Sequence, residues 1–339
     1  MKNISVSEVG EREWLLNLNE YAHSLFITAE WVNAMQSGNS KAVFYNFVDG
    51  GTVVGKLSGL INNRYLYCYA SPALKVYEQN MFDACHVALY RYALKQKYLR
   101  IVLGSYDQQH ELACRAKGFF TTNRFEYIVD FRPTAGELHF SKGFKKNVKH
   151  AEKNSISFIQ SDSDDVMKKL FTLLNLTREH RVSKYGTQYN PFYLQNMDEQ
   201  SLTRLLNSGI VKLYYVLFEN EIHSVQYNIE KNGQVYGLLM GSNNKAYELG
   251  FPSYIDFNMI QRFRDGGFKY YNPGGGTDDS GNEGIEKYKH SMGGTKVFVH
   301  GATTNYIVFP QKILNFLLNI GRMLPRKNPA VKLLKRMIG

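Results

Sequence analysis

The residue types best suited to chemistry gather late in the chain, in the stretch 270–294, YYNPGGGTDDSGNEGIEKYKHSMGG. A strand-like start is broken at Pro273 and is followed by three consecutive glycines, Gly274, Gly275 and Gly276. Glycine permits backbone conformations and close approaches that a side chain would block, so a ligand could reach the backbone here. Glycine also collects in ordinary surface loops. The run therefore predicts either a substrate-binding turn or a mobile loop.

Carboxylates and a short basic helix follow the glycines. Asp278 and Glu283 lie where a carboxylate could accept a proton from an amine, although such residues also occur in solvated acidic loops. Lys289 is either a functional cation or a solvated helix lysine. Its neighbour Tyr288 is either a substrate contact or a core residue, because it has helical spacing from other apolar positions.

Positive charge is concentrated in two segments of a chain whose net charge is +11. The first segment, residues 142–153, holds five lysines against one glutamate. Three of these lysines fall on one expected helix: Lys145, Lys146 and Lys149. A lysine can bind phosphate as a point charge, so this face either holds a phosphorylated substrate or is simply solvated.

The second basic segment, residues 311–339, contains seven basic residues and no acidic one. Its apolar residues Ile313, Phe316, Leu317 and Ile320 share one helical stripe. A cationic amphipathic segment of this kind can lie on an anionic bilayer. Docking of the stripe onto the protein's own core is the alternative.

Length and composition limit the class of protein. At 339 residues and 44% hydrophobic content, the chain can build two domains, each with a sizeable core. Neither a secretory signal nor an apolar run long enough to span a membrane is apparent. The three cysteines are odd in number and lack metal-ligand spacing. We therefore expect reduced thiols, a cytoplasmic protein and no bound metal.

The order of elements repeats between the two halves of the chain. Each half is expected to run strand, strand, strand, helix, strand, helix, strand, with VFYNF at 43 matched by LYYVL at 213. Helices are expected in a lead-in over 1–40 and at 75–97, 107–117, 164–181, 191–207, 252–266 and 283–292. The pattern predicts an N-terminal domain over 1–135, a C-terminal domain over 136–310 and a tail over 311–339. Each domain would be an α/β (α+β) fold whose mixed, mainly antiparallel sheet is flanked by helices.

Four motifs resemble the tandem GNAT-type N-acyltransferases, the group that contains the Fem-type (FemAB-like) peptidoglycan aminoacyltransferases. They are FITAEWVNA at 26–34, FKKNVKHAEKNSISF at 144–158, LGFPSYIDFNMIQRFRDGGFKYYNPGGG at 249–276 and IEKYKHSMGG at 285–294. The resemblance spans most of residues 20–310. It implies two packed GNAT-like domains, of which the second carries the active site and the first has no donor site of its own.

The sequence departs from the family where coenzyme A would bind. Coenzyme A-dependent members carry a Gln/Arg-x-x-Gly-x-Gly/Ala loop that cradles the pyrophosphate at a helix start. Here the matching residues 243–254 read NNKAYELGFPSY, with Gly250 present and the rest of the loop missing. The donor therefore stays open between an acyl-coenzyme A or acyl carrier and an aminoacyl-tRNA.

The resemblance also implies roles for the residues introduced above. Amide formation needs a held amine, a route for its proton and donors for the developing oxyanion. The resemblance puts Lys289 beside the acyl transfer, and the residues themselves offer Asp278 or Glu283 as proton acceptor. The remaining candidates would bind substrate: Gly274, Gly275, Gly276, Tyr288 and, at a diphosphate, Lys145, Lys146 and Lys149.

We expect a bacterial N-acyltransferase of the cytoplasm, peripheral on the inner membrane face, that acylates an amino group of a cell-envelope precursor. The first expected acceptor is a nucleotide- or lipid-linked amino sugar of surface polysaccharide biosynthesis. One rival is an aminoacyl-tRNA-dependent transferase that extends a peptidoglycan peptide. The other is a non-catalytic protein of the same fold that binds a membrane or a nucleic acid, which the basic segments would equally serve.

Overall fold

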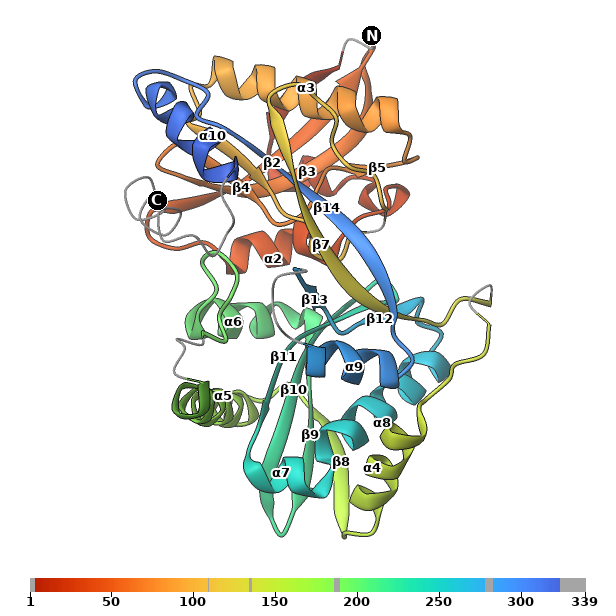
Figure 1. Cartoon of the computed structure of the whole chain (residues 1–339). Coiled ribbons are helices and arrows are strands. Elements are labelled where there is room, and N and C mark those ends of the chain that lie inside the picture. The colour runs from red at the N-terminus through yellow and green to blue at the C-terminus, as the bar shows by residue number, and fades with distance from the viewer. Residues whose placement is uncertain (1–3, 109, 134–135, 186–189, 278–282, 324–339) are drawn as a thin grey trace. The chain divides into compact units, whose positions relative to one another are not determined.

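The computed structural model describes residues 4–108, 110–133, 136–185, 190–277 and 283–323 (Figure 1). These residues form two compact units. Unit 1 comprises the described residues of Met1–Val32, Gln36–Asn123 and Val299–Gly339, and unit 2 those of Asn33–Met35 and Arg124–Phe298. Two strands contribute residues to both units: β7 (Phe119–Asp130) and β14 (Thr295–Thr304).

A mixed sheet of strand order β1-β2-β3-β4-β6-β14 organises unit 1. The strands β4 and β6 run parallel, and the remaining registered neighbours are antiparallel. Val43, Tyr45 and Phe47 alternate along β2, so all three side chains enter one core. The strand bounds are β1 (Ser5–Val9), β2 (Ser40–Asp49), β3 (Thr52–Asn62), β4 (Tyr65–Cys68), β5 (Ala73–Leu74) and β6 (Arg100–Leu103).

Helix α3 (Gln79–Lys95) follows β5 and covers that core with Phe82, Cys85 and Leu89. The three cysteines of the chain, Cys68, Cys85 and Cys114, are buried free thiols. Shorter elements complete the unit: α1 (Glu11–Leu15), η1 (Leu18–Glu20), η2 (Leu25–Ile27), α2 (Ala29–Ala34, whose end belongs to unit 2), η5 (Gln311–Leu314) and α10 (Asn315–Met323).

Unit 2 repeats this order of elements around its own sheet, β7-β12-β11-β10-β9-β8. Here β11 and β12 are the parallel pair, and α8 (Phe251–Asp265) lies between them in the chain. The strand bounds are β8 (Ile156–Ser161), β9 (Val211–Phe218), β10 (Glu221–Lys231), β11 (Gln234–Ser242), β12 (Tyr270–Asn272) and β13 (Gly275–Gly276).

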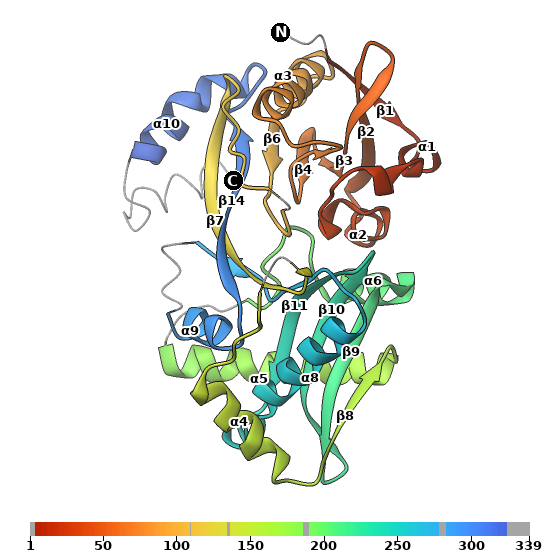
Figure 2. The same ribbon diagram turned by 90° about the vertical axis from the view of Figure 1, so that its right-hand side faces the viewer.

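Helices cover both faces of the unit 2 sheet (Figure 2). Helices α4 (Lys142–Glu152) and α8 pack Phe144, Ile255 and Met259 into the core on one face. On the other face, Leu170 and Leu173 of α5 (Asp164–Tyr185) lie against Gly241. The remaining elements are α6 (Glu199–Leu205), η4 (Leu206–Ile210), α7 (Asn244–Leu249) and α9 (Glu283–Ser291).

The expected fold class is therefore confirmed, with mixed, mainly antiparallel sheets flanked by helices. The helix predicted at 107–117 is wrong, because the described residues of that segment form no helix. Side chains bond its backbone instead: the amide of Leu112 donates to His110 Nδ1 at 3.1 Å, and that of Arg115 donates to Asp83 Oδ1 at 2.8 Å. Among its described residues, unit 1 consequently shows no helix at the position that corresponds to α9.

Two further predicted boundaries need correction. The helical lead-in over 1–40 begins with strand β1, which pairs with β2 along Ser5–Val9. The helix predicted over 191–207 begins only at Glu199, because Asp198 caps it by accepting from the backbone amide of Ser201 at 2.7 Å. Within the described part of the chain, no helix is both long and apolar enough to cross a membrane.

Candidate active site

The parallel pair β11 and β12 separates soon after it forms. Its last paired residues are Tyr236 and Asn272, after which the chain turns at Pro273 and Gly274. Gly274 has a φ of +74°, which a side chain would disfavour, and its amide donates to Asn272 Oδ1 at 2.9 Å. Strand β13 then pairs with β7 on the opposite side. The turn opens a gap beside the continuing strand β11.

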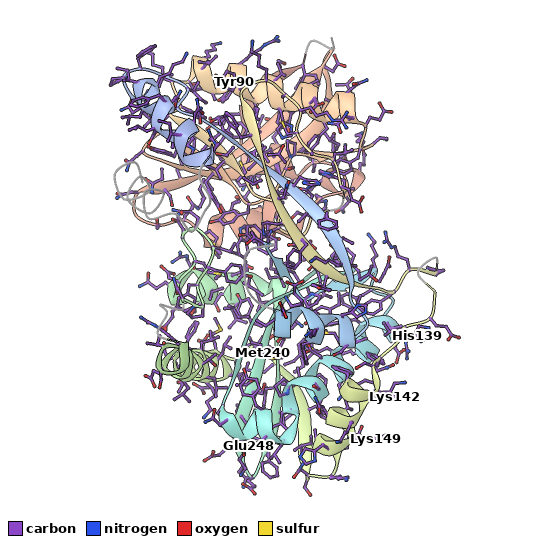
Figure 3. The ribbon with its side chains drawn as sticks, in the orientation of Figure 1. Tyr90, His139, Lys142, Lys149, Met240 and Glu248 are labelled. Atoms are coloured by element: carbon purple, nitrogen blue, oxygen red, sulfur yellow. The ribbon has the colours of Figure 1, made fainter. Side chains whose placement is uncertain are left out.

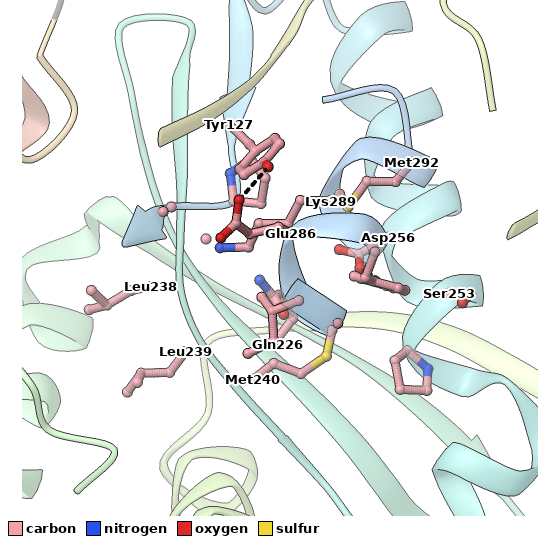
Figure 4. A pocket seen from close by; sticks show the side chains of 18 of the residues that line it. Tyr127, Gln226, Leu238, Leu239, Met240, Ser253, Asp256, Glu286, Lys289 and Met292 are labelled. Atoms are coloured by element: carbon pink, nitrogen blue, oxygen red, sulfur yellow. Dashed lines mark hydrogen bonds between the residues drawn. The ribbon is translucent and has the colours of Figure 1, made fainter. Parts of the chain in front are cut away.

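A pocket of about 540 Å³ occupies this opening (Figure 4). Its wall includes residues Gly237–Met240 of β11 and the predicted glycines Gly274, Gly275 and Gly276. Helix α8 contributes Ser253 and Asp256, and helix α9 contributes Glu286, Tyr288 and Lys289. Open α/β sheets commonly bind ligands beyond the carboxyl ends of parallel strands that diverge, which is the position of this pocket.

Lys289 lies beside the glycine turn, because a Cβ built on Gly274 would stand 3.8 Å from its Nζ atom. Burial lowers the pKa of Lys289 to about 8, against the opposing attraction of Glu126 and Asp256. The Lys289 side chain is therefore still mostly in its protonated ammonium form at neutral pH. A cation in a partly desolvated pocket interacts more strongly with a developing negative charge than it would in water.

Asp256 is a pocket residue that the sequence analysis missed. It is 3% exposed, and its carboxylate accepts hydrogen bonds from Tyr288 at 2.6 Å and from Tyr271 at 3.3 Å. Burial raises the pKa of Asp256 to about 6, although both hydrogen bonds oppose the change. A signal existed in the sequence, because Asp256 shares a helical stripe with the apolar residues Ile260 and Phe263.

Tyr271 extends this network to the sheet. Its hydroxyl accepts a hydrogen bond from Gln226 Nε2 at 3.2 Å, and Gln226 also lines the pocket. A Cβ on Gly237 would lie 2.7 Å from both Gln226 Nε2 and the Tyr271 hydroxyl. The glycine therefore makes room for these two polar groups beside β11. Glycine and tyrosine positions within strands carry no distinctive sequence signal, so neither role could be predicted.

A second acidic group stands on the other side of Lys289. Glu286 accepts from Tyr127 at 3.3 Å, as the dashed line in Figure 4 shows, and from Lys296 at 3.1 Å. Glu126 is fully buried nearby and accepts from Asn272 at 2.9 Å. Opposite charges thus surround the lysine.

The other predicted site residues lie in different settings. Glu283 is exposed at the start of α9, 4.0 Å from the exposed Lys287, and Asp278 lies outside the described residues. Lys145, Lys146 and Lys149 are exposed on α4, and Figure 3 shows Lys149 projecting from that helix. Among the described residues these lysines do not line the pocket, although Asn147 of the same helix does.

Residues 243–254, where coenzyme A-dependent members carry the pyrophosphate loop, form helical structure here. Helix α7 is capped by Asn243, whose side chain accepts from the amide of Ala246. The amide of Gly250 donates to Tyr247 O at 3.3 Å, and a Cβ on Gly250 would stand 2.6 Å from Asn147 O. In the described part of the chain, no group of His, Cys, Asp and Glu is arranged to hold a metal ion.

Comparison with known proteins defines the class. Residues 139–290 match the family model described as an acetyltransferase (GNAT) domain, and this range holds most of the pocket residues. No curated protein matches the sequence. The chain therefore carries a GNAT acetyltransferase domain, as its motifs predicted.

Solved structures narrow the likeness. The chain resembles FemX at a TM-score of 0.66 and 13% identity, over 92% of this chain and 99% of that one. It resembles L-PGS from Bacillus licheniformis at a TM-score of 0.56 and 13% sequence identity, over 93% of this chain and 97% of that one. It also resembles a conserved protein of unknown function from Bacteroides thetaiotaomicron, at a TM-score of 0.58 and 12% sequence identity, over 90% of this chain and 100% of that one. At these identities the likeness concerns the fold, which is of the Fem-like GNAT type.

Proposed function

We propose that unit 2 transfers an acyl group to an amino group of a cell-envelope precursor, with an amino sugar of surface polysaccharide as acceptor. The observation that carries the proposal is the pocket where β11 and β12 separate, because it brings Lys289 and Asp256 to one space. The matched GNAT domain model supports the reaction class. The reaction would take place in the cytoplasm, where nucleotide-linked precursors are made.

In this mechanism the acceptor amine attacks the acyl carbon of a thioester held in the opening. A carbon–nitrogen bond forms, the carbon–sulfur bond breaks, and the thiol leaves with a proton. Lys289, in its ammonium form, stabilises the oxyanion of the tetrahedral intermediate and supplies the proton to the leaving group. Its pKa of about 8 suits both roles near neutral pH.

The carboxylate of Asp256 takes the proton from the attacking amine. With a pKa of about 6, Asp256 is ionised at neutral pH. Its pKa is also closer to that of the amine than the pKa of an ordinary aspartate is, which makes it a better proton acceptor. Tyr288 and Tyr271 hold the carboxylate in place through their hydroxyl groups. Asp278 and Glu283 remain alternative proton acceptors in the proposal.

The acceptor enters along the glycine turn, so that Gly274, Gly275 and Gly276 contact it through their backbone. Lys145, Lys146 and Lys149 attract the diphosphate of a nucleotide- or lipid-linked acceptor from their exposed positions on α4. We further propose that unit 1 holds no donor, in keeping with the single matched domain in unit 2.

Acyl-coenzyme A or an acyl carrier is the first proposed donor, and aminoacyl-tRNA is the second. The filled segment at α7 favours the second, because the amide of Gly250 is engaged and the backbone of α4 lies against it. The likeness in fold to FemX and to a domain of a putative lysylphosphatidylglycerol synthetase points the same way. With such an ester the bond that breaks is carbon–oxygen, and a peptide of peptidoglycan or a lipid headgroup is the proposed acceptor.

Product formation by the purified full chain tests the proposal. Acetyl-coenzyme A and a charged tRNA are each offered with an amino-sugar nucleotide and with a peptidoglycan-precursor peptide, and products are detected by mass spectrometry. Acylated amino sugar made from acetyl-coenzyme A supports the first form, and product made only from charged tRNA supports the second. If wild type and Lys289→Met are equally inactive with every pair, while the protein binds nucleic acid with equal affinity in both forms, the non-catalytic alternative replaces both.

A further inference from the structure

Helix α10 is held to unit 1 by a polar face. The side chain of Asn315 bonds both backbone groups of Tyr306, accepting from its amide and donating to its carbonyl at 2.9 Å each. One turn later, Asn319 Oδ1 accepts from Asn305 Nδ2 at 3.0 Å. Arg322 donates to Asn305 and lies 3.7 Å from the ring centroid of Phe120. The helix is thus fixed in its rotation about its own axis.

The apolar stripe of the same segment faces water. Four large side chains are exposed: Phe309 by 70%, Ile313 by 62%, Phe316 by 58% and Ile320 by 46%. Surface helices of globular proteins normally turn their apolar stripe to the core and their polar face to solvent. Here asparagines hold the helix to the unit, and three members of the predicted stripe, Ile313, Phe316 and Ile320, point outward, whereas the fourth, Leu317, is half-buried. Figure 2 shows α10 at the periphery of its unit.

We propose that the outward face of η5 and α10, defined by Ile313, Phe316 and Ile320 together with Phe309 just before them, binds the surface of an anionic membrane. Charge complementarity selects this partner. By sequence, residues 311–339 carry seven basic residues and no acidic one, of which Lys312 and Arg322 lie within the described residues. Large aromatic and aliphatic side chains insert at the boundary between headgroups and acyl chains, and nearby lysines and arginines attract anionic headgroups.

A second copy of the chain is a less suitable occupant, because two such cationic segments would repel each other. The inference is independent of the proposed reaction, although it would bring the enzyme to a lipid-linked acceptor. Binding to vesicles requires neither donor nor acceptor. Its failure can therefore be told apart from failure of the proposed function.

Flotation of the purified full chain with vesicles tests the proposal. One vesicle type contains phosphatidylcholine with a quarter phosphatidylglycerol, and the other contains phosphatidylcholine alone. Wild type should float with the anionic vesicles. Binding to these vesicles in 0.5 M salt, and binding to the neutral vesicles without added salt, should each be at least tenfold weaker.

The variant Ile313→Ser/Phe316→Ser should lose at least about tenfold in partitioning onto anionic vesicles, because two inserted side chains are removed. The matched control Leu16→Ser/Val76→Ser changes two residues of unit 1 that are equally exposed, at 65% and 66%, and should bind as wild type does. Thermal denaturation should be unchanged in both, since none of these side chains is buried.

Several outcomes would overturn the proposal. Equal binding by wild type and Ile313→Ser/Phe316→Ser would assign vesicle binding to the basic residues alone. Absence of binding to either vesicle type would remove the membrane as partner. A wild-type dimer in light scattering that becomes a monomer in this variant would assign the face to a second copy of the chain.

Discussion

The two units contain the same parallel pair of strands, and only one of the pairs opens. In unit 1, β4 and β6 pair as far as Cys68 and Leu103, and the contact then continues. The amide of Gly104 donates to Cys68 O at 2.7 Å, and that of Tyr106 donates to Tyr69 O at 3.1 Å. In unit 2 the corresponding pair β11 and β12 ends at Tyr236 and Asn272, and a pocket follows.

Aromatic side chains fill the space beyond the closed pair. The ring of Tyr69 lies 5.2 Å from that of Trp31, which lies 4.5 Å from Phe26. Phe26 in turn lies 5.4 Å from Tyr106. Aromatic rings thus pack against one another just beyond the closed pair of unit 1. The same order of elements thus gives a packed core in unit 1, where the parallel strands β4 and β6 stay paired. It gives a pocket in unit 2, where the chain turns away from β11 at the end of β12.

The largest expected effect comes from Lys289, the cation that lines the pocket of unit 2. Lys289→Met should lower kcat for acyl transfer by at least about 100-fold, because the oxyanion and the leaving group lose their charged partner. Steady-state kinetics measures this loss. Lys287→Met is the matched control on the same helix, since the Lys287 side chain is 82% exposed, and its kcat should stay within about twofold of wild type. Equal losses in the two variants would contradict the assignment.

The next effect concerns the buried carboxylate. Asp256→Asn should lower kcat by roughly 10- to 100-fold, since the amide cannot take a proton. The wild-type rate should rise as pH increases through about 6, where Asp256 ionises, and fall above about 8, where Lys289 loses its proton. The variant should lose the rise near pH 6 and keep the fall near pH 8. A rise that persists in Asp256→Asn would assign the proton acceptor to another residue.

Stability provides a second readout of the same carboxylate. A carboxyl group whose pKa is raised by folding stabilises the protein below its ordinary pKa of 3.8, and this contribution is lost as pH rises through about 6. The contribution of Asp256 to the free energy of unfolding should therefore fall by up to ~3 kcal/mol between pH 4 and pH 7. Urea denaturation of wild type and Asp256→Asn at both pH values measures the difference, which should disappear in the variant.

A pair of glycine substitutions probes the closed and open strand pairs directly. Gly104→Ala would bring a Cβ to 2.3 Å from the backbone oxygen of Tyr69, so unit 1 should lose about 2–4 kcal/mol of stability. The atoms nearest to a Cβ in Gly237→Ala belong to side chains, those of Gln226 and Tyr271, and not to the backbone. This substitution should cost less stability but lower kcat/KM about tenfold, because the network around Asp256 shifts. Urea denaturation and kinetics should rank the two variants in opposite order.

The smallest effect belongs to the lysines of α4. Replacing Lys145, Lys146 and Lys149 together by glutamine should raise KM for a diphosphate-linked acceptor about three- to tenfold and leave kcat unchanged. KM for an acceptor without phosphate should not change. The effect should shrink as salt is added, because these side chains are exposed. An unchanged KM for the diphosphate acceptor would make this face merely solvated.

Local patterns predicted most of the framework. Alternating apolar residues defined β2, and a nearly continuous apolar run defined β6. The predicted helix at 107–117 failed because contacts from Asp83, distant in sequence, bond the backbone of that segment. Such contacts depend on tertiary structure, which a single sequence does not display.

The site was predictable to a similar degree. The glycine run and Lys289 were found from their motif and line the pocket. Asp256 was missed because the helical pattern around it indicates only an apolar stripe, and its partners Tyr271 and Tyr288 come from other elements. The tail showed its amphipathic stripe, but only the bonds of Asn315 determine which face points outward.

The number of donor sites per chain tests the central claim most directly. Native mass spectrometry is performed on the full chain with acetyl-coenzyme A and, separately, with a hydrolysis-resistant aminoacyl-tRNA. Gly284→Trp should block the pocket mouth, because Gly284 lines the pocket and a Cβ there meets no atom within 4 Å. Gly38→Trp, which meets equally open space in unit 1, is the control. We predict one bound donor in wild type and Gly38→Trp and none in Gly284→Trp. Two donors per chain, or one that survives Gly284→Trp, would contradict the account.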